Sequence, residues 1–530
     1  MRHKRHTLVL SITLAVGCAV AALAGCGSSG SSSGASSSAS AGQPVAGGNL
    51  VIANPLDAKS LDEANVFDNN SIWILEQITQ PLFTVTSNGK SVQPLLATGY
   101  TVSKDLKTYT ISLRHGVKFS TGAPMTSKDV QFTLEQTMAA SAGWGYIDSA
   151  IKSVGAPSPY TVVISLKYPW APLLADLALF ANGVVPDNYG GKSHDAFYQA
   201  PVGTGPFTFD YWHKGTALKL LKNPDYWQPG KPYLDSVTWT YVPDDNTRQL
   251  QVKGGQAQID QFPAWSTVAE LKAAPGVTMS LFPSTETHYL AFNENVKPFQ
   301  DVNVRRAISY AIDRSALVKA VLFGNGQPAN SLFPPQVPYY DANSGGLQYN
   351  LAAAKAAMAK SSVPHGFTTT LQIPSGDSDY STIATILQSE LKPLGINVQI
   401  QQLDANTQND DFQAGKYDMS FALWTMDIPD PDELATFGLD PDAGSKSFFT
   451  SYDNPTVVKA VHAAEVTTDQ AARQADYDTA QTVSAQNAFM AFLYYSPYAY
   501  AESSNVHGFF VTPLGNYHME DVWLSPSSSG

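Results

Sequence analysis

The chain has 530 residues, of which 43% are apolar, 15% are charged and only two are cysteines. This composition is typical of a folded globular protein, and the length exceeds what one hydrophobic core usually serves, so two or three lobes are expected. The formal net charge of −13 argues against a nucleic-acid partner, because phosphates are bound by clusters of Lys and Arg.

The first 25 residues have the pattern of a secretory signal sequence. A cationic cluster at residues 2–6 precedes an apolar run at 8–23. That run is shorter than the roughly 20 residues that a membrane-spanning helix needs. Cleavage after residue 25 would remove three basic residues and take the net charge from −13 to −16.

The stretch Leu23-Ala24-Gly25-Cys26 resembles the lipobox of bacterial lipoproteins, in which the signal is cleaved before a cysteine that carries diacylglycerol. The resemblance implies that Cys26 is the lipidation site and that the protein is held at the extracytoplasmic face of a bacterial membrane. The alternative is ordinary signal cleavage beside an incidental cysteine. Residues 26–47 are rich in Ser and Gly and have no apolar face, which predicts a flexible linker.

The first half of the folded body is predicted to be mainly β. A strand is expected at 48–53, hairpins over 87–113 and a second β-rich stretch at 202–242, because apolar and polar residues alternate there between turn residues. One helix is expected to begin at Thr126, with Asp129 completing a capping box.

The second half alternates helices and strands. The apolar spacing over 301–324 predicts two consecutive helices, the second of which begins at Asp313. From residue 369 onward a strand, helix, strand, helix and strand are predicted, at 369–374, 380–394, 397–403, near Phe412 and at 417–424. This order implies a mainly parallel sheet, and ligands bind beyond the carboxyl ends of such strands. A ligand is therefore expected near the residues that follow Trp424.

The chain lacks recognisable catalytic motifs. The Gly-Lys-Ser triplets at 89–91 and 191–193 lack the earlier glycine of a P-loop, and 203–205 lacks the third glycine of a dinucleotide fingerprint. Outside the Ser/Gly-rich stretch at 26–47 there is no Gly-x-Ser-x-Gly elbow, and the ten histidines do not have the spacing of metal ligands. We therefore expect a protein that is not an enzyme and that holds neither a cofactor nor a metal.

A series of short motifs follows in one order along the chain. They are PLF at 81–83, NGK at 88–90, PLLA at 94–97, LRHGVKFSTGAP at 113–124, PVGTGPF at 201–207, NPDYW at 223–227, YLAFN at 289–293, VRRA at 304–307 and AIDR at 311–314. The ordered set resembles the extracellular solute-binding proteins of family 5, the peptide/nickel type (cluster C) that serves ABC importers.

The resemblance implies an α/β, three-lobed, periplasmic-binding-protein type II-like fold with mixed sheets and a ligand cleft between two main lobes. Carried over to this chain, lobe I comprises 48–82, 198–283 and 489–526, lobe II is 83–197, and lobe III is 284–488. It also implies a monomer that closes on its ligand by a hinge motion and delivers it to an ABC transporter permease.

The segment after residue 421 carries the most specific implied site. Trp424 and Asp427 match a family pattern of a tryptophan three residues before an aspartate, which in the oligopeptide and dipeptide receptors holds the α-ammonium of the peptide. The resemblance therefore implies that Asp427 is the anchor, while Trp424 offers an apolar face to the adjacent pocket. The alternative is that Asp427, Asp430 and Asp432 only turn the chain beside two prolines.

Two further places in the chain are implied to face the ligand. Asn69, Asn70 and Ser71 align approximately with the lobe I segment that faces the ligand in the family. Phe262 lies near a crossing between lobes and is expected to line the same cleft. A surface turn would explain the polar trio nearly as well.

Several functions remain open at this point. The first is a receptor that captures a small ligand, most readily a peptide, for an ABC importer. Oligosaccharides, nickel chelates and other small solutes are alternative ligands, and a receptor that presents its ligand to a sensor is an alternative function. An extracytoplasmic hydrolase is the remaining class.

Overall fold

The computed structural model of the chain describes residues 43–141, 143–443 and 445–526. The predicted signal sequence, Cys26 and the linker as far as residue 42 lie outside the described residues. Within the described ranges, no helix combines the length and the apolar character that crossing a bilayer requires.

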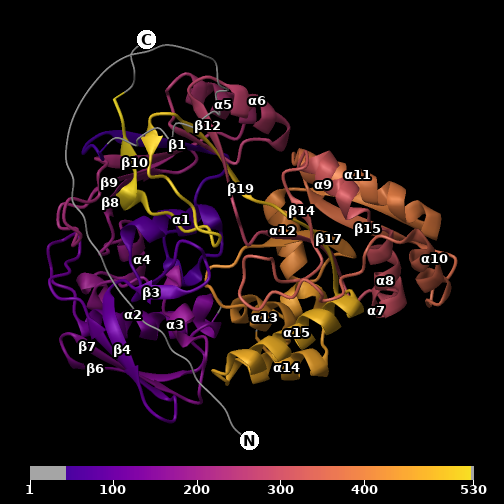
Figure 1. Ribbon diagram of the computed structural model, residues 1–530, viewed down its shortest axis with the longest axis horizontal. Coiled ribbons are helices and arrows are strands. Elements are labelled where there is room, and N and C mark those ends of the chain that lie inside the picture. Colours follow the sequence, from indigo (N-terminus) through magenta and orange to yellow (C-terminus); the bar gives the residue numbers. More distant parts are fainter. Residues whose placement is uncertain (1–42, 142, 444, 527–530) are drawn as a thin grey trace, which may run out of the picture. The chain divides into compact units, whose positions relative to one another are not determined.

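A seven-stranded sheet joins distant parts of the chain (Figure 1) in the order β12-β19-β11-β1-β10-β9-β8. β1 runs parallel to β10 and β11, while the other neighbours are antiparallel. Its strands are β1 (Asn49–Asn54), β8 (Phe207–His213), β9 (Ala217–Lys222), β10 (Ser236–Tyr241), β11 (Ile259–Gln261), β12 (Val277–Phe282) and β19 (Tyr498–Ser503). The helices packed against them are α1 (Asn69–Ile78), α5 (Asp245–Lys253) and α6 (Val268–Ala273).

A four-stranded antiparallel sheet, in the order β4-β5-β7-β6, is packed against α2. The elements of this part are β2 (Phe83–Val85), β3 (Val92–Pro94), β4 (Ala97–Val102), β5 (Thr108–Leu113), α2 (Ser127–Ala139), β6 (Ile151–Ser158), β7 (Thr161–Leu166), α3 (Leu173–Asp176) and α4 (His194–Tyr198). The capping box is confirmed, because Thr126 N donates to Asp129 Oδ2 at 2.6 Å and Thr126 caps α2.

A six-stranded mixed sheet, in the order β14-β18-β13-β17-β15-β16, confirms the predicted alternation of strands and helices. β15 is parallel to β16 and β17, and β13 is antiparallel to β17 and β18. Its strands are β13 (Thr287–Phe292), β14 (Gln327–Pro328), β15 (Phe367–Pro374), β16 (Ile396–Leu403), β17 (Met419–Trp424) and β18 (Met490–Tyr495). The helices of the same region are α7 (Lys297–Gln300), α8 (Val302–Ala311), α9 (Arg314–Val321), α10 (Leu351–Ala359), α11 (Ser378–Leu391) and α12 (Ala405–Gln413).

This mixed sheet is buried on both faces, because alternate residues of β13 enter different cores. Leu290 and Phe292 belong to the core under α8, α9 and α11, whereas Tyr289 and Ala291 belong to a second core. The helices that contribute to the second core are α13 (Asp432–Leu439), α14 (Pro455–Glu465) and α15 (Gln470–Asn487). The short pair β20 (Val506–His507) and β21 (Trp523–Leu524) follows near the end of the chain.

Strand pairing shifts one expected boundary. The resemblance implies that residues 489–526 belong to lobe I as one piece, but β18 pairs with β13 and therefore belongs to the six-stranded sheet. Only β19 joins the seven-stranded sheet, so the crossing lies between Tyr495 and Tyr498. β18 and β19 follow one another along the chain but belong to different sheets. Both strands are mainly apolar, so the sequence alone does not show which sheet each one joins. The other lobe boundaries stay predictions.

Several carboxyl groups are buried, and Asp148 illustrates what this does to stability. Its side chain is fully buried beside α2; Oδ1 accepts a hydrogen bond of 3.4 Å from Asn182 Nδ2, and Oδ2 has no partner among the described residues. Burial raises the pKa of Asp148 from 3.8 to about 7. Between about pH 4 and pH 7 the folded protein therefore keeps a proton that the unfolded chain has already released.

Asp148→Asn should remove this pH-dependent cost. The stabilising effect of the bound proton is complete below about pH 4 and is lost as the pH rises to about 7. We expect the variant to match the wild type near pH 4 and to exceed its free energy of unfolding by about 2–4 kcal/mol at pH 8, measured by urea unfolding. Asp195→Asn, at a side chain that is 98% exposed, is the control. An equal change at both pH values would contradict the prediction.

Candidate ligand-binding site

A cavity of about 720 Å³ is lined by residues that are far apart in the sequence. Its walls come from the segments around α1 and η2 (Trp144–Tyr146), from α12 and from β17 with the turn after it. This volume lies within the range of small-ligand pockets.

Most of the predicted ligand residues line this cavity. They are Asn69, Asn70, Phe262, Trp424 and Asp427. The structure thus brings the start of α1 and the turn after β17 to one cavity, whereas the sequence indicated them only as separate segments. Whether each residue contacts a ligand stays a prediction.

Ser71, the third residue of the polar trio, is not among the residues that line the cavity. Its side chain is fully buried, and its hydroxyl donates to Asp68 and accepts from the backbone N–H of Lys59 at 2.8 Å. Asp68 in turn caps α1 by accepting from Ser71 N. Because the helix begins at Asn69, the third residue of the trio turns inward and stabilises the helix start.

Asn69 joins two elements that lie 356 positions apart in the chain. Its Nδ2 donates to Thr425 Oγ1 at 3.1 Å, so the start of α1 is linked directly to the turn after β17. Asn70 makes a contact on the other side, where its Oδ1 accepts from Asn54 Nδ2 at 3.0 Å.

Asp427 lies three residues beyond the end of β17, as the strand pattern predicted. Its backbone N–H donates to Glu433 Oε2 at 2.8 Å, but its own carboxylate accepts no hydrogen bond from any described residue. Burial, together with the nearby carboxyl groups of Glu433 and Glu76, raises the pKa of Asp427 well above its ordinary value. A cation entering the cavity would therefore find an unpaired acid.

Glu433 holds the turn that carries the two most specific predicted residues. It accepts hydrogen bonds from Trp424 Nε1 at 3.1 Å, Asp427 N at 2.8 Å and Ile428 N at 3.0 Å. Burial raises the pKa of Glu433 to about 7 even though these three bonds favour its charged form. Sequence reasoning missed Glu433, although its place in the first turn of α13 (Asp432–Leu439) is one where acids commonly bind backbone N–H groups.

Aromatic side chains dominate the cavity wall, and most of them were not predicted. Twelve of the 28 lining residues are aromatic: Phe67, Trp73, Trp144, Tyr146, Phe262, Tyr380, Phe412, Phe421, Trp424, Phe437, Phe448 and Phe449. Trp424 packs edge-on against Phe448, with 5.2 Å between the ring centroids. No local pattern distinguishes these rings from core residues, because what they share is proximity across the fold.

Three of these aromatic residues have left-handed backbone conformations. Phe262, Phe448 and Phe449 have φ angles of 58°, 46° and 61°. Such angles are costly for bulky residues and are found most often at ligand sites, where packing enforces them. The strain at Phe262 is supported by two hydrogen bonds, from its N–H to Ala499 O and from Arg248 Nη2 to its carbonyl.

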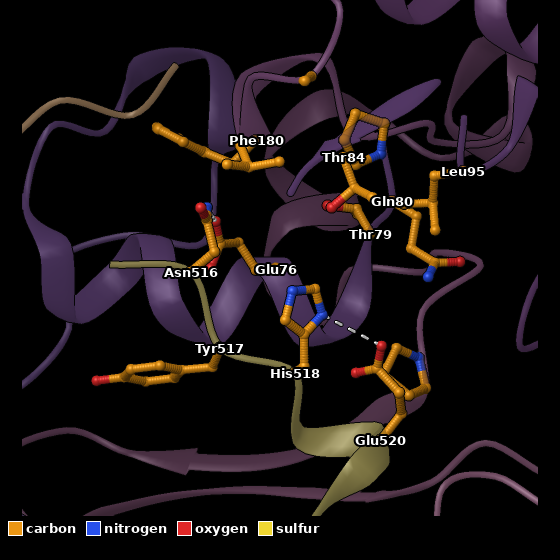
Figure 2. Close-up of a pocket in the computed structure, with 14 residues that line it drawn as sticks. Glu76, Thr79, Gln80, Thr84, Leu95, Phe180, Asn516, Tyr517, His518 and Glu520 are labelled. Atoms are coloured by element: carbon orange, nitrogen blue, oxygen red, sulfur yellow. Dashed lines mark hydrogen bonds and ion pairs between the residues drawn. The ribbon is translucent and has the colours of Figure 1, made fainter. Parts of the chain in front are cut away.

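A second, smaller cavity of about 60 Å³ lies at the C-terminal end of α1 (Figure 2). Glu76 lies at its wall, where it accepts from Asn516 Nδ2, and His518 contacts Glu520 at 3.4 Å. Burial raises the pKa of Glu76 to about 7. The space is too small for more than a few water molecules. It matters for the large cavity only through Glu76, whose carboxyl group helps to raise the pKa of Asp427.

The described residues include no group of three or more His, Cys, Asp and Glu that is arranged to hold a metal ion. The groups with which the large cavity can contact a ligand are the unpaired carboxyl group of Asp427, a few side-chain amides and a broad aromatic wall.

Comparison with known proteins identifies the family. Residues 91–446 match the model of the bacterial extracellular solute-binding proteins, family 5. The chain belongs to this family. It is 30% identical over 480 residues to the probable D,D-dipeptide-binding periplasmic protein DdpA of Escherichia coli K12, covering 88% of this chain and 92% of that protein.

Solved structures agree with this assignment. The periplasmic binding protein DppA of Helicobacter pylori in complex with the peptide STSA has a TM-score of 0.84 and 29% identity, and covers 91% of this chain and 99% of its own. The oligopeptide-binding protein AppA of Bacillus subtilis in complex with a nonapeptide has a TM-score of 0.81 and 25% identity, covering 91% and 100%. The predicted type II periplasmic-binding-protein fold with mixed sheets is confirmed.

Glu433→Gln should weaken the turn after β17. A glutamine presents an N–H₂ group to at least one of the three donors that the carboxylate accepts, and an unmatched buried polar group costs about 1–3 kcal/mol. We expect the free energy of unfolding to fall by about that amount, and the fluorescence of Trp424 to change. The measurements are urea unfolding and emission spectra of the variant with the wild type as reference.

Glu135→Gln is the matched control, since Glu135 is exposed on α2 and accepts from Gln131 within the same helix. A loss of stability no larger than in this control would show that Glu433 does not hold the turn.

Proposed function

We propose that the protein is a membrane-tethered extracytoplasmic receptor that captures a peptide through its α-ammonium group and delivers it to an ABC importer. The observation that carries this proposal is the buried carboxyl group of Asp427, which has no hydrogen-bond donor among the described residues and lies in the wall of a cavity of about 720 Å³. A protonated amine supplies the donors and the positive charge that this group lacks.

The relatives support the choice of ligand. Proteins named or titled for a D,D-dipeptide, for the peptide STSA and for a nonapeptide match over about nine-tenths of this chain. The aromatic wall also suits a peptide, since flat apolar faces accept side chains of many shapes.

Closure on the ligand follows from the way in which the cavity is assembled. α1 and Phe262 belong to the part built on the seven-stranded sheet, whereas β17 and Asp427 belong to the six-stranded sheet. A ligand between them makes contacts that exist only in the closed arrangement and therefore favours it. The bond between Asn69 and Thr425 would be part of that arrangement.

Binding of an ammonium should be linked to the protonation of Asp427. The pKa of this carboxyl group is raised without a cation, and a bound cation lowers it, so binding releases a proton. The receptor is proposed to return the ligand unchanged to the permease, as a capture protein and not a hydrolase.

Asp427→Asn is expected to cost about 2–5 kcal/mol of affinity for a peptide with a free amine, by analogy with other truncated charge pairs in buried interfaces. Acetylation of the peptide amine should weaken binding to the wild type similarly, and the two losses should not add. Isothermal titration calorimetry measures all four combinations, and mass spectrometry of the recovered peptide checks that it is intact.

Asp442→Asn is the matched control, because Asp442 is exposed and lies outside the cavity wall. Equal affinity of the wild type for free and acetylated peptides would reject the anchor. Recovery of cleaved peptide would favour an enzyme instead of a receptor.

Cys26→Ala should release the protein from the membrane. Two or more acyl chains give stable anchoring, at about 0.8 kcal/mol per buried CH₂, where a single chain is marginal. We expect the variant in the soluble fraction after expression in a bacterial host, and the wild type in the membrane fraction. Retention of the variant in the membrane fraction would show that Cys26 is not the anchor.

A further inference from the structure

The charges on the cavity wall have one sign. Three lining residues are carboxylic acids, Asp68, Glu286 and Asp427, and none of the described lining residues is Lys, Arg or His. A short peptide in its ordinary form is a zwitterion, so a cavity that buries both of its ends needs groups of both signs.

Two of the three acids already have partners. Glu286 Oε1 lies 2.8 Å from His288 Nε2 and accepts from Ser496; burial opposes ionisation, yet these contacts hold the pKa of Glu286 below its ordinary value. Asp68 accepts from the backbone N–H of Ser71 at 3.0 Å and from its hydroxyl. These two groups are occupied by the protein itself.

Asp427 is the exception, because its carboxyl group accepts no hydrogen bond from any described residue. Glu433 and Glu76 both act on it as like charges. The hydrogen bonds that Glu433 makes are directed to Trp424 Nε1 and to backbone N–H groups, so they bring no cation into the cavity. The region around Asp427 therefore offers an unpaired carboxyl group to a cation, and its described residues offer no cationic side chain to an anion.

The rest of the wall offers nothing that would hold an anion by charge. The electron-rich faces of its twelve aromatic rings attract cations and not carboxylates. A ligand carboxylate buried here would be desolvated without a partner, which is among the most costly events in binding. The neutral amides of Gln408, Asn409 and Gln413 are the only side-chain amides on the α12 side of the wall.

We propose that this cavity selects short ligands of net positive charge, namely peptide-like amines whose carboxyl end is amidated, esterified or absent. The inference rests on the proposed function of Asp427 as the ammonium anchor and adds what the site rejects. The ammonium is the single ionic anchor, the aromatic wall receives the remainder of the ligand, and a free terminal carboxylate weakens binding.

The test compares two pools of random tripeptides that lack acidic and basic side chains. One pool has free terminal carboxylates and the other has terminal amides, and both have free amines. Native mass spectrometry or calorimetry of the mature protein measures the affinities. We expect the amide pool to bind at least about tenfold more tightly, which corresponds to about 1.4 kcal/mol.

Equal or tighter binding of the acid pool would overturn the inference. N-acetylated forms of both pools separate this failure from failure of the proposed function. If acetylation does not weaken binding, the ammonium anchor itself is wrong. If acetylation weakens binding but amidation gives no gain, only the selection against carboxylates is wrong.

A charge inserted into the wall provides a second, independent measurement. Gln413→Lys places a cation at the end of α12, where the helix tolerates it, and the Gln413 side chain makes no hydrogen bond to any described residue. We expect affinity for the acid pool to rise about tenfold and the preference for amides to disappear.

Gln402→Lys makes the same change in net charge at an exposed residue of β16 that lies outside the cavity wall. It should leave the ratio of the two affinities as in the wild type. An unchanged ratio in Gln413→Lys, or the same change of ratio in Gln402→Lys, would contradict a preference that is set by the charges of the wall.

Discussion

The carboxylate of Glu433 constrains the part of the molecule on which the candidate site depends. It binds the indole of Trp424 and two successive backbone N–H groups, at Asp427 and Ile428. Glu433, in the first turn of α13 (Asp432–Leu439), thus accepts hydrogen bonds from these N–H groups of the turn after β17. As a result the side chain of Asp427 is free to face the cavity instead of capping its own turn, as short acidic side chains commonly do.

The buried acids explain the electrostatic character of the fold. Asp148, Glu76 and Glu433 are each buried with pKa values raised to about 7. Each costs stability as the pH rises, because the folded state must either hold a proton or bury a charge. Burial raises the pKa of Asp427 in the same way, and under the proposed function a ligand cation would remove this cost on binding.

The cavity is made by packing between elements that are remote in the sequence. Asn69 reaches Thr425, and η2 (Trp144–Tyr146) of the part built on the four-stranded sheet supplies Trp144 and Tyr146 to the same wall. Trp144 is itself fixed by a hydrogen bond of 2.7 Å from Nε1 to Val66 O. Segments that are remote from one another in the sequence therefore line one cavity, and a rigid-body motion that separates them would alter its volume.

Local patterns in the sequence were sufficient for the elements. The capping box at Thr126, the break before Asp313 and the strand that ends at Trp424 were predicted and are confirmed, because hydrophobic period and caps depend only on near neighbours. The family, and with it the fold class, was also accessible from the order of short motifs. Asp427 and Trp424 were found because a strand end and a motif coincide there.

Only the tertiary structure decided the rest. The side on which Ser71 lies depends on the first residue of α1, and the sheet to which β18 belongs depends on which edge is free to pair. The aromatic wall, and the lack of Lys, Arg and His among its described residues, arise from the proximity of residues hundreds of positions apart. Hydrophobic patterning determines which residues are buried, but a one-sided charge on a cavity arises only when separate sheets pack together.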